Sequence, residues 1–138
     1  MLSLKVCFCA QILVCGGNFN NADGGTQASA SSFLLDFSRA PLAWQQEAQA
    51  TPRVMPDAVL LPDGTVVIVN GAAYGIAGGS PGNSNAFNNG NYGPRCAELY
   101  NPAQPVGQRW SGLLADSTFD RLYHSEAYLT TNGDVSAC

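Results

Sequence analysis

The chain has 138 residues, enough for one domain, and 46% of them are hydrophobic, enough to bury a core. Charged residues make up only 12%, whereas glycine (15) and proline (8) are frequent. This balance is typical of short strands joined by turns. The net charge of −4, without any cluster of lysine or arginine, argues against nucleic acid and anionic membranes as partners.

The N-terminal segment and the cysteines indicate little about localisation. Residues 1–10 place one lysine before apolar residues, but the apolar run continues without a small-x-small cleavage site, so we predict no signal peptide. No stretch reaches the ~18 apolar residues that a membrane span requires. The cysteines are odd in number, so at least one thiol stays unpaired within the chain, and we interpret most of them as apolar fillers of strands. They are Cys7, Cys9, Cys15, Cys96 and Cys138.

The first third of the chain predicts strands separated by a polar loop. Residues 11–17 form an apolar run that ends in paired glycines, as a buried strand closed by a tight turn does. Residues 18–32 are polar and lack a period, which predicts a surface loop, and 32–37 is the next strand. Residues 45–51 are compatible with one helical turn, which Pro52 would end.

Two hairpins are predicted in the remainder. The strand ending at Leu61 is followed by Pro62-Asp63-Gly64 and by Val66–Val69, and proline and glycine at these positions set the two turn angles. The segment 74–93, rich in glycine and asparagine, predicts a long loop, and 96–100 predicts a strand. The second hairpin spans residues 127–138.

The same order of features occurs twice: strand, turn, tryptophan, arginine, strand, glycine turn, strand. The pairs are Trp44 and Trp110, Arg53 and Arg121, and Gly64 and Gly133. The arginines are 68 residues apart, and removing the 20 residues of the insertion 74–93 leaves 48. This spacing is close to the ~40–50 residues of a four-stranded propeller blade.

We therefore expect an all-β fold, with residues 1–138 forming part of a kelch-like β-propeller domain. About two blades are expected, the first over residues 11–71 and the second over 94–138, with the insertion loop 74–93 between them. Two blades form an incomplete ring and leave apolar faces exposed. Two unrelated hairpins in a sandwich are the alternative.

The sequence also resembles a known family over residues 11–138. Five stretches carry the resemblance: ILVCGG (12–17), RVMPDAVLLPDGT (53–65), NGA with GIAG (70–72 and 75–78), AELYNP (97–102) and RLYHS (121–125). They are similar to the copper radical oxidases, in particular glyoxal oxidase and its galactose oxidase relatives. The resemblance covers most of this chain but only the middle of the family's propeller.

The resemblance implies a site at Tyr123 and His124. In that family two histidines and two tyrosines hold Cu(II), and one tyrosine is cross-linked to a cysteine and carries a radical. The resemblance implies that Tyr123 is the axial copper ligand and the catalytic base, and that His124 is an equatorial ligand. It also implies small aldehydes and O₂ as substrates, carboxylic acids and H₂O₂ as products, and secretion of the full-length proteins.

The chemistry of this pair is consistent with copper. Imidazole suits Cu(II), and the charge of the metal lowers the pKa of a phenol from about 10. Adjacent residues of a regular strand point to opposite faces, so the backbone must bend if both side chains reach one ion. Judged by residue type alone, a single histidine beside a tyrosine is more often structural.

Several family features have no counterpart here. His124 is the one histidine, and no motif marks a radical tyrosine with its cysteine partner. The hypotheses are therefore a fragment of a copper radical oxidase, inactive by itself, or a non-catalytic propeller fragment or binding module. We interpret the other prominent residues structurally. Trp44 and Trp110 pack between blades, Arg53 and Arg121 hold strand ends or carbonyls, and Asp57 and Asp63 belong to loops and turns.

Overall fold

The computed structural model describes residues 10–17, 27–49, 51–74, 95–122 and 124–138. Within these ranges every regular element is a β-strand, and nine strands form three antiparallel sheets, which confirms the all-β class. None of the described residues belongs to a helix that is long and apolar enough to cross a bilayer. Residues 1–9, nearly all of the predicted loop 74–93, and Tyr123 lie outside the described residues.

The first sheet has the order β1-β2-β3, with β1 at Gln11–Cys15, β2 at Ser31–Asp36 and β3 at Trp44–Ala48. The helical turn predicted at 45–51 is wrong, because Trp44–Ala48 pairs antiparallel with β2. Glu47 is buried between two exposed neighbours, which is the period of two that a strand requires. Pairing with the edge of β2 outweighs the local helical preference.

The second sheet has the order β4-β5-β6-β7. Its strands are β4 (Asp57–Leu60), β5 (Val66–Val69), β6 (Cys96–Tyr100) and β7 (Trp110–Asp116). The first predicted hairpin is confirmed as β4-β5. In its turn the Asp63 carboxylate accepts hydrogen bonds from the amide (3.0 Å) and the hydroxyl (2.6 Å) of Thr65, and Gly64 has a φ of 84°.

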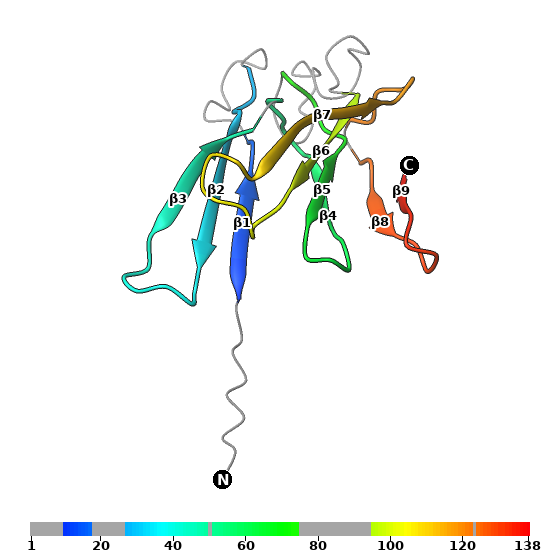
Figure 1. Cartoon of the computed structure of the whole chain (residues 1–138). Coiled ribbons are helices and arrows are strands. Elements are labelled where there is room, and N and C mark those ends of the chain that lie inside the picture. Colours follow the sequence, from blue (N-terminus) through cyan, green and yellow to red (C-terminus); the bar gives the residue numbers. More distant parts are fainter. Residues whose placement is uncertain (1–9, 18–26, 50, 75–94, 123) are drawn as a thin grey trace.

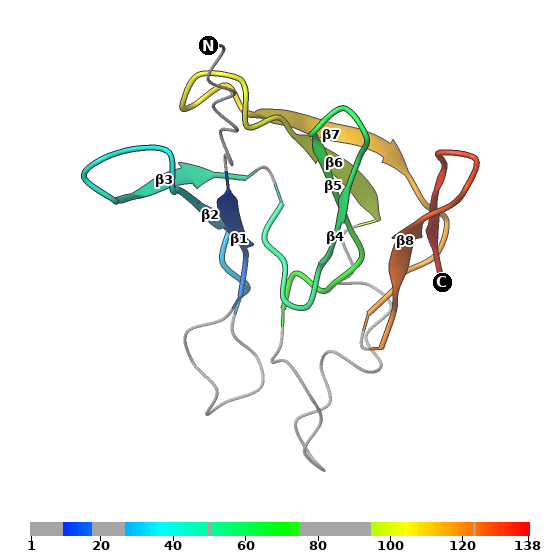
Figure 2. The ribbon, with the colours of Figure 1, turned by 90° about the horizontal axis from the view of Figure 1, so that it is seen from below.

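The third sheet is the second predicted hairpin, with β8 at Ala127–Leu129 and β9 at Val135–Ala137. Its turn repeats that of the first hairpin. The Gly133 amide donates to the Thr130 carbonyl at 3.0 Å, as the Gly64 amide donates to the Leu61 carbonyl at 3.0 Å. The three sheets follow one another in chain order across the molecule, with β8 beside β4 (Figures 1 and 2).

The sheets do not divide the chain at the insertion 74–93. The expected division places the hairpin 57–69 in one blade and residues 94–138 in the next, whereas β5 pairs with β6 across that insertion. The boundary between sheets falls between β3 and β4 instead. Each copy of the sequence repeat therefore combines the last strands of one sheet with the first strands of the next sheet.

A buried polar cluster joins the first two sheets. The Glu47 carboxylate of β3 accepts hydrogen bonds from Arg109 (3.1 Å) and from the Tyr100 hydroxyl (3.3 Å). The Trp110 indole nitrogen donates to the Ser32 hydroxyl at 3.0 Å, and its ring lies 5.0 Å from that of Tyr100. The role predicted for Trp110, packing between sheets, is confirmed.

The opposite face of the first sheet is exposed. Ile12 and Val14 are each 46% exposed and Trp44 is 51% exposed, although all three are large and apolar. Val14, Trp44 and Phe33 line one shallow cavity on this face. Large apolar side chains are therefore uncovered on this face, and Trp44 is exposed there, whereas Trp110 packs against Tyr100.

Candidate functional site

The segment that contains the predicted metal ligands is a tight turn before β8. The Arg121 carbonyl accepts a hydrogen bond from the Gly71 amide at 2.9 Å. At the next residue, the Leu122 carbonyl accepts from both the amide (3.3 Å) and the hydroxyl (2.6 Å) of Ser125. The chain is therefore fixed on both sides of the two residues that the sequence predicts as ligands.

His124 occupies the apex of this turn. Its φ is 60°, in the left-handed region that non-glycine residues rarely adopt, and its side chain is exposed. The bend that the sequence requires if adjacent side chains are to approach one ion is thus present at His124. Tyr123 lies outside the described residues, so the approach of the two rings stays a prediction.

Apolar packing anchors the start of the turn. Leu122 packs against a small core of Ala28, Val54 and Ala72. Gly71 brings the neighbouring backbone close, because its φ is 87° and a Cβ there would lie 2.6 Å from the Val54 carbonyl oxygen. Only glycine fits both constraints, so Gly71 is needed for the hydrogen bond that holds the Arg121 carbonyl.

The same backbone feature occurs one repeat earlier. The Gly17 amide donates to the Arg53 carbonyl at 2.8 Å, as the Gly71 amide donates to that of Arg121. Met55 has a φ of 52° and lies 69 residues before His124, the same spacing that separates the two hairpin glycines. One residue separates Arg53 from Met55, but two separate Arg121 from His124. Between these positions the second segment is therefore one residue longer than the first.

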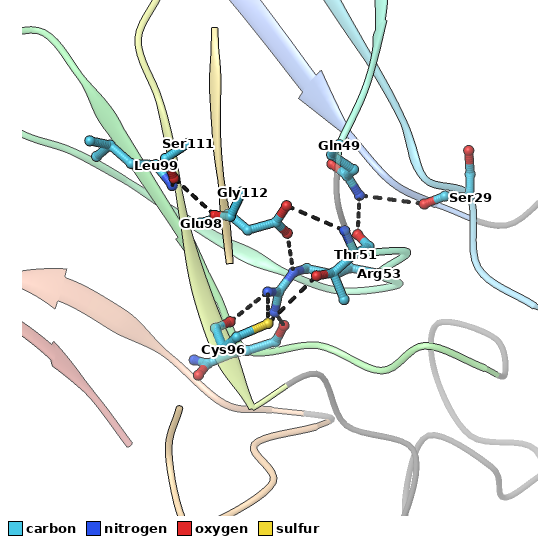
Figure 3. Close-up of polar contacts among 10 residues, drawn as sticks. Ser29, Gln49, Thr51, Arg53, Cys96, Glu98, Leu99, Ser111 and Gly112 are labelled. Atoms are coloured by element: carbon cyan, nitrogen blue, oxygen red, sulfur yellow. Dashed lines mark hydrogen bonds and ion pairs between the residues drawn. The ribbon is translucent and has the colours of Figure 1, made fainter. Parts of the chain in front are cut away.

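Arg53 shows what the recurring arginine does between the first and second sheets. Its side chain is fully buried and donates to the Asn70 carbonyl (2.8 Å) and to the Cys96 carbonyl, while its Nε lies 3.4 Å from the Glu98 carboxylate (Figure 3). Glu98 also accepts from the Thr51 amide at 3.3 Å. The prediction that Arg53 holds strand ends and carbonyls is confirmed.

Arg121 has a different environment. It is partly buried, donates to the Ser117 hydroxyl at 2.9 Å, and lines a cavity of about 240 Å³. Beside the cavity Arg95 forms an ion pair with Asp120 at 2.8 Å, and this bond raises the pKa of the arginine. The cavity is lined by Val69, Asn70, Arg95, Cys96, Ala97, Ala115, Asp116, Ser117, Phe119, Arg121 and Ala137.

Other possible donors have structural roles. Burial raises the pKa of the Cys15 thiol to about 12, with a smaller contribution from Glu98, so this thiol is neutral near pH 7. Burial likewise raises the pKa of Tyr100 to about 12, and its hydroxyl bonds to Glu47. Among the described residues no three side chains of His, Cys, Asp or Glu gather as a metal cluster would.

The sequence did not reveal the two carboxylates, Glu47 and Glu98, that bind buried arginines between the first and second sheets. Glu47 lies in a segment predicted as a helical turn, and Glu98 lies in a predicted strand without any assigned role. An arginine that recurs at a fixed place in an apolar repeat was the available signal. It implies a buried cation, and a buried cation requires a carboxylate partner.

Comparisons with known proteins agree with this architecture. The family model for the glyoxal oxidase N-terminus matches residues 1–138. An aldehyde oxidase (GLOX1) of Arabidopsis thaliana is 35% identical over 133 residues, covering 91% of this chain and 20% of its own length. An aldehyde oxidase (GLOX) of Vitis pseudoreticulata is 35% identical over 130 residues, covering 91% of this chain and 23% of its own length. The chain thus spans about a fifth of these curated relatives.

One solved structure is similar across most of the chain. It is a fungal alcohol oxidase of the AA5 family in complex with copper, with a TM-score of 0.65 and 22% sequence identity. The match covers 91% of this chain and 23% of that protein. At this identity the similarity supports the fold, and this chain corresponds to part of that larger structure.

Proposed function

This chain belongs to the glyoxal oxidase N-terminal family, and from that premise we propose that it is a segment of a copper radical oxidase. The full-length protein would oxidise small aldehydes to carboxylic acids with O₂ and release H₂O₂. The observation that carries the proposal is the Arg121–Ser125 run, which supplies a phenol and an imidazole in adjacent positions at a fixed turn. The aldehyde oxidases of Arabidopsis and Vitis support this substrate class.

Within this proposal each residue of the turn has a distinct role. His124 would hold copper through its imidazole, and Tyr123 would hold it through its phenol oxygen and accept the proton of the substrate as the catalytic base. Leu122 and Ser125 would fix the direction of the two ligands, one by packing and one by its hydrogen bond to the Leu122 carbonyl. When bound, copper would supply the one-electron redox chemistry of the reaction.

The donors of this chain fit copper in kind but are too few. Imidazole and phenolate are suitable ligands for Cu(II), yet this sequence has one histidine and no residue marked as the radical tyrosine. Two protein donors on an exposed turn bind a metal weakly. We therefore propose that the 138-residue chain is catalytically inactive by itself.

The finer architecture follows the same proposal. The sheet β4-β7 is one complete blade of a kelch-like propeller, β1-β3 belong to the blade before it, and β8-β9 begin the blade after it. The repeated hydrogen bonds from Gly17 and Gly71 to the arginine carbonyls support this assignment. So do the repeated hairpin turns at Leu61–Thr65 and Thr130–Asp134.

Two measurements on the purified chain test the proposal. Titration with Cu(II), followed by electron paramagnetic resonance, should give weak binding with nitrogen hyperfine coupling that His124→Ala removes. Tyr128→Phe is a matched control, because Tyr128 is an exposed phenol in β8. Copper binding that is unchanged in His124→Ala would exclude His124 as a ligand.

The second measurement concerns activity. With Cu(II) and methylglyoxal the chain should release no peroxide, because the second histidine and the radical tyrosine are lacking. Peroxide that depends on His124 would show that the two donors suffice, and it would overturn the proposed inactivity.

A non-catalytic role remains the second candidate. A kelch-like segment that serves only as a scaffold or a binding module would also account for the sheets and junctions. The presence of a single histidine favours it, since copper sites of this kind need further imidazole ligands. Copper binding without a His124 contribution would support this role.

A further inference from the structure

The cavity beside Arg121 lies between the second and third sheets. It corresponds to a space between the first and second sheets that the Arg53 side chain and its partners fill. There, Arg53 extends from the segment before β4 and is enclosed by the end of β5 and by β6, which pairs with β5. Arg121 precedes β8 in the same way, and β9 corresponds to β5 in the repeated hairpin. Among the described strands none pairs with the second edge of β9.

The groups around the two arginines correspond in position. Arg53 is held by the Asn70 and Cys96 carbonyls and by the Glu98 carboxylate. Counting 69 residues on from each of these three gives positions beyond residue 138. Between the second and third sheets the corresponding space is instead the cavity of about 240 Å³, which is lined by both Arg121 and Ala137 of β9.

We propose that this cavity is a docking site for an extended strand that carries a carboxylate. The strand would pair antiparallel with the open edge of β9, as β6 pairs with β5. Its carboxylate would bind the Arg121 guanidinium as Glu98 binds that of Arg53. Arg121 is partly buried, and the lining of the cavity contains two arginines, Arg95 and Arg121, against one carboxylate, Asp116. The excess of positive charge is complementary to an added carboxylate.

The occupant is a separate extended segment rather than a folded second copy of this chain. β6 carries the carboxylate that binds Arg53, and both edges of β6 are already paired, with β5 and with β7. β2 corresponds to β6 in the first sheet, but it carries Phe33 where β6 carries Glu98. The edge strands β3, β4 and β7 also carry carboxylates, but Glu47 is bonded to Arg109, Asp57 is bonded to Asn70, and Asp116 lines this cavity itself. A folded copy therefore offers no edge strand whose carboxylate is as free as the site requires.

A synthetic strand tests the site directly. The probe is a fluorescent peptide that copies residues 95–101 with Cys96→Ser, and its binding to the full 138-residue chain is measured by fluorescence anisotropy. We expect saturable binding that weakens at least about tenfold in the Arg121→Gln chain, because one partner of an enclosed charge pair is lost. A peptide with Glu98→Gln should lose a similar factor, and the two changes together should lose little more than either alone.

Arg39→Gln is the matched control for charge. Arg39 is a largely exposed arginine that pairs with Asp36 in the first sheet, away from β9, and its loss should leave peptide binding unchanged. Circular dichroism establishes that each variant is folded before binding is compared. Absence of binding, or equal binding by wild type and Arg121→Gln, would overturn the proposal.

Sedimentation of the chain alone tests whether a second copy of the chain, and not an acidic strand, fills the cavity. Self-association that disappears in Arg121→Gln would mean that a second copy fills the cavity, and the assignment to an acidic strand would be wrong. Because the peptide assay contains no copper, its failure would leave the proposed ligands Tyr123 and His124 untouched. Conversely, loss of copper binding would not affect the docking site.

Discussion

At the scale of single residues, Gly71 has the strictest requirement near the candidate site. Its positive φ is shared with Gly133, at 87° and 89°, but only Gly71 has a backbone oxygen 2.6 Å from where a Cβ would lie. Gly133 has nothing within 4 Å of that position. The two glycines therefore separate the cost of a left-handed backbone from the cost of a steric clash.

We expect Gly133→Ala to lower the free energy of unfolding by about 1 kcal/mol, the cost of a left-handed alanine. Gly71→Ala should lower it by about 3 kcal/mol, because the Val54 carbonyl must also move. Urea denaturation measures both values. Equal losses would mean that the backbone near Val54 adapts freely, and that the turn before His124 is not held by this contact.

At the scale of elements, the Arg53–Glu98 pair fixes the segment between β3 and β4 onto β6. Both side chains are fully buried, so removing the charge of one leaves the other buried without its partner. We expect Arg53→Gln and Glu98→Gln each to lower the free energy of unfolding by about 3 kcal/mol or more. Arg39→Gln removes an exposed ion pair instead, and should cost less than about 1 kcal/mol.

Urea denaturation again provides the measurement, with all three variants compared under the same conditions. A loss in Arg53→Gln no larger than that in Arg39→Gln would contradict a structural role for the buried pair. It would also remove the basis for comparing Arg121 with Arg53.

The elements that the sequence predicts well are those set by local chemistry. Pro62-Asp63-Gly64 and Asn132-Gly133 determine their turns within five residues, and the two hairpins form as expected. β3 and β7 were not predicted as strands, because their pairing partners lie in β2 and β6 and not in their own sequence. The grouping of strands into sheets depends on the same long-range pairing, so the blade boundary could not be located from the repeat alone.

The candidate site, too, could be predicted from the sequence only in part. The resemblance of Arg121–Ser125 to a known family identifies the ligand types, and the need for a backbone bend follows from the alternation of side chains along a strand. The left-handed conformation of His124, its equivalence to Met55, and the buried partner of Arg53 depend on contacts between segments far apart in the chain. These features required the structure.

At the scale of the whole molecule, the first and second sheets are joined by the cluster around Glu47. Its carboxylate bonds to Arg109 and Tyr100 of the second sheet, and all three side chains are buried. Trp110 packs on Tyr100 and is a natural probe of this junction, whereas Trp44 is half exposed. In a Trp44→Phe background, fluorescence therefore reports the junction and far-ultraviolet circular dichroism reports all the strands.

We expect the two signals to give one coincident urea transition in the Trp44→Phe chain, because the junction couples the sheets. Glu47→Gln should shift the Trp110 transition to lower urea than the circular dichroism transition, since Arg109 is then buried without a carboxylate. Gln46→Ala, at the exposed neighbouring position of β3, is the control and should keep the transitions coincident. If Glu47→Gln lowers both midpoints together, the sheets unfold as a unit even without this cluster, and apolar packing must couple them instead.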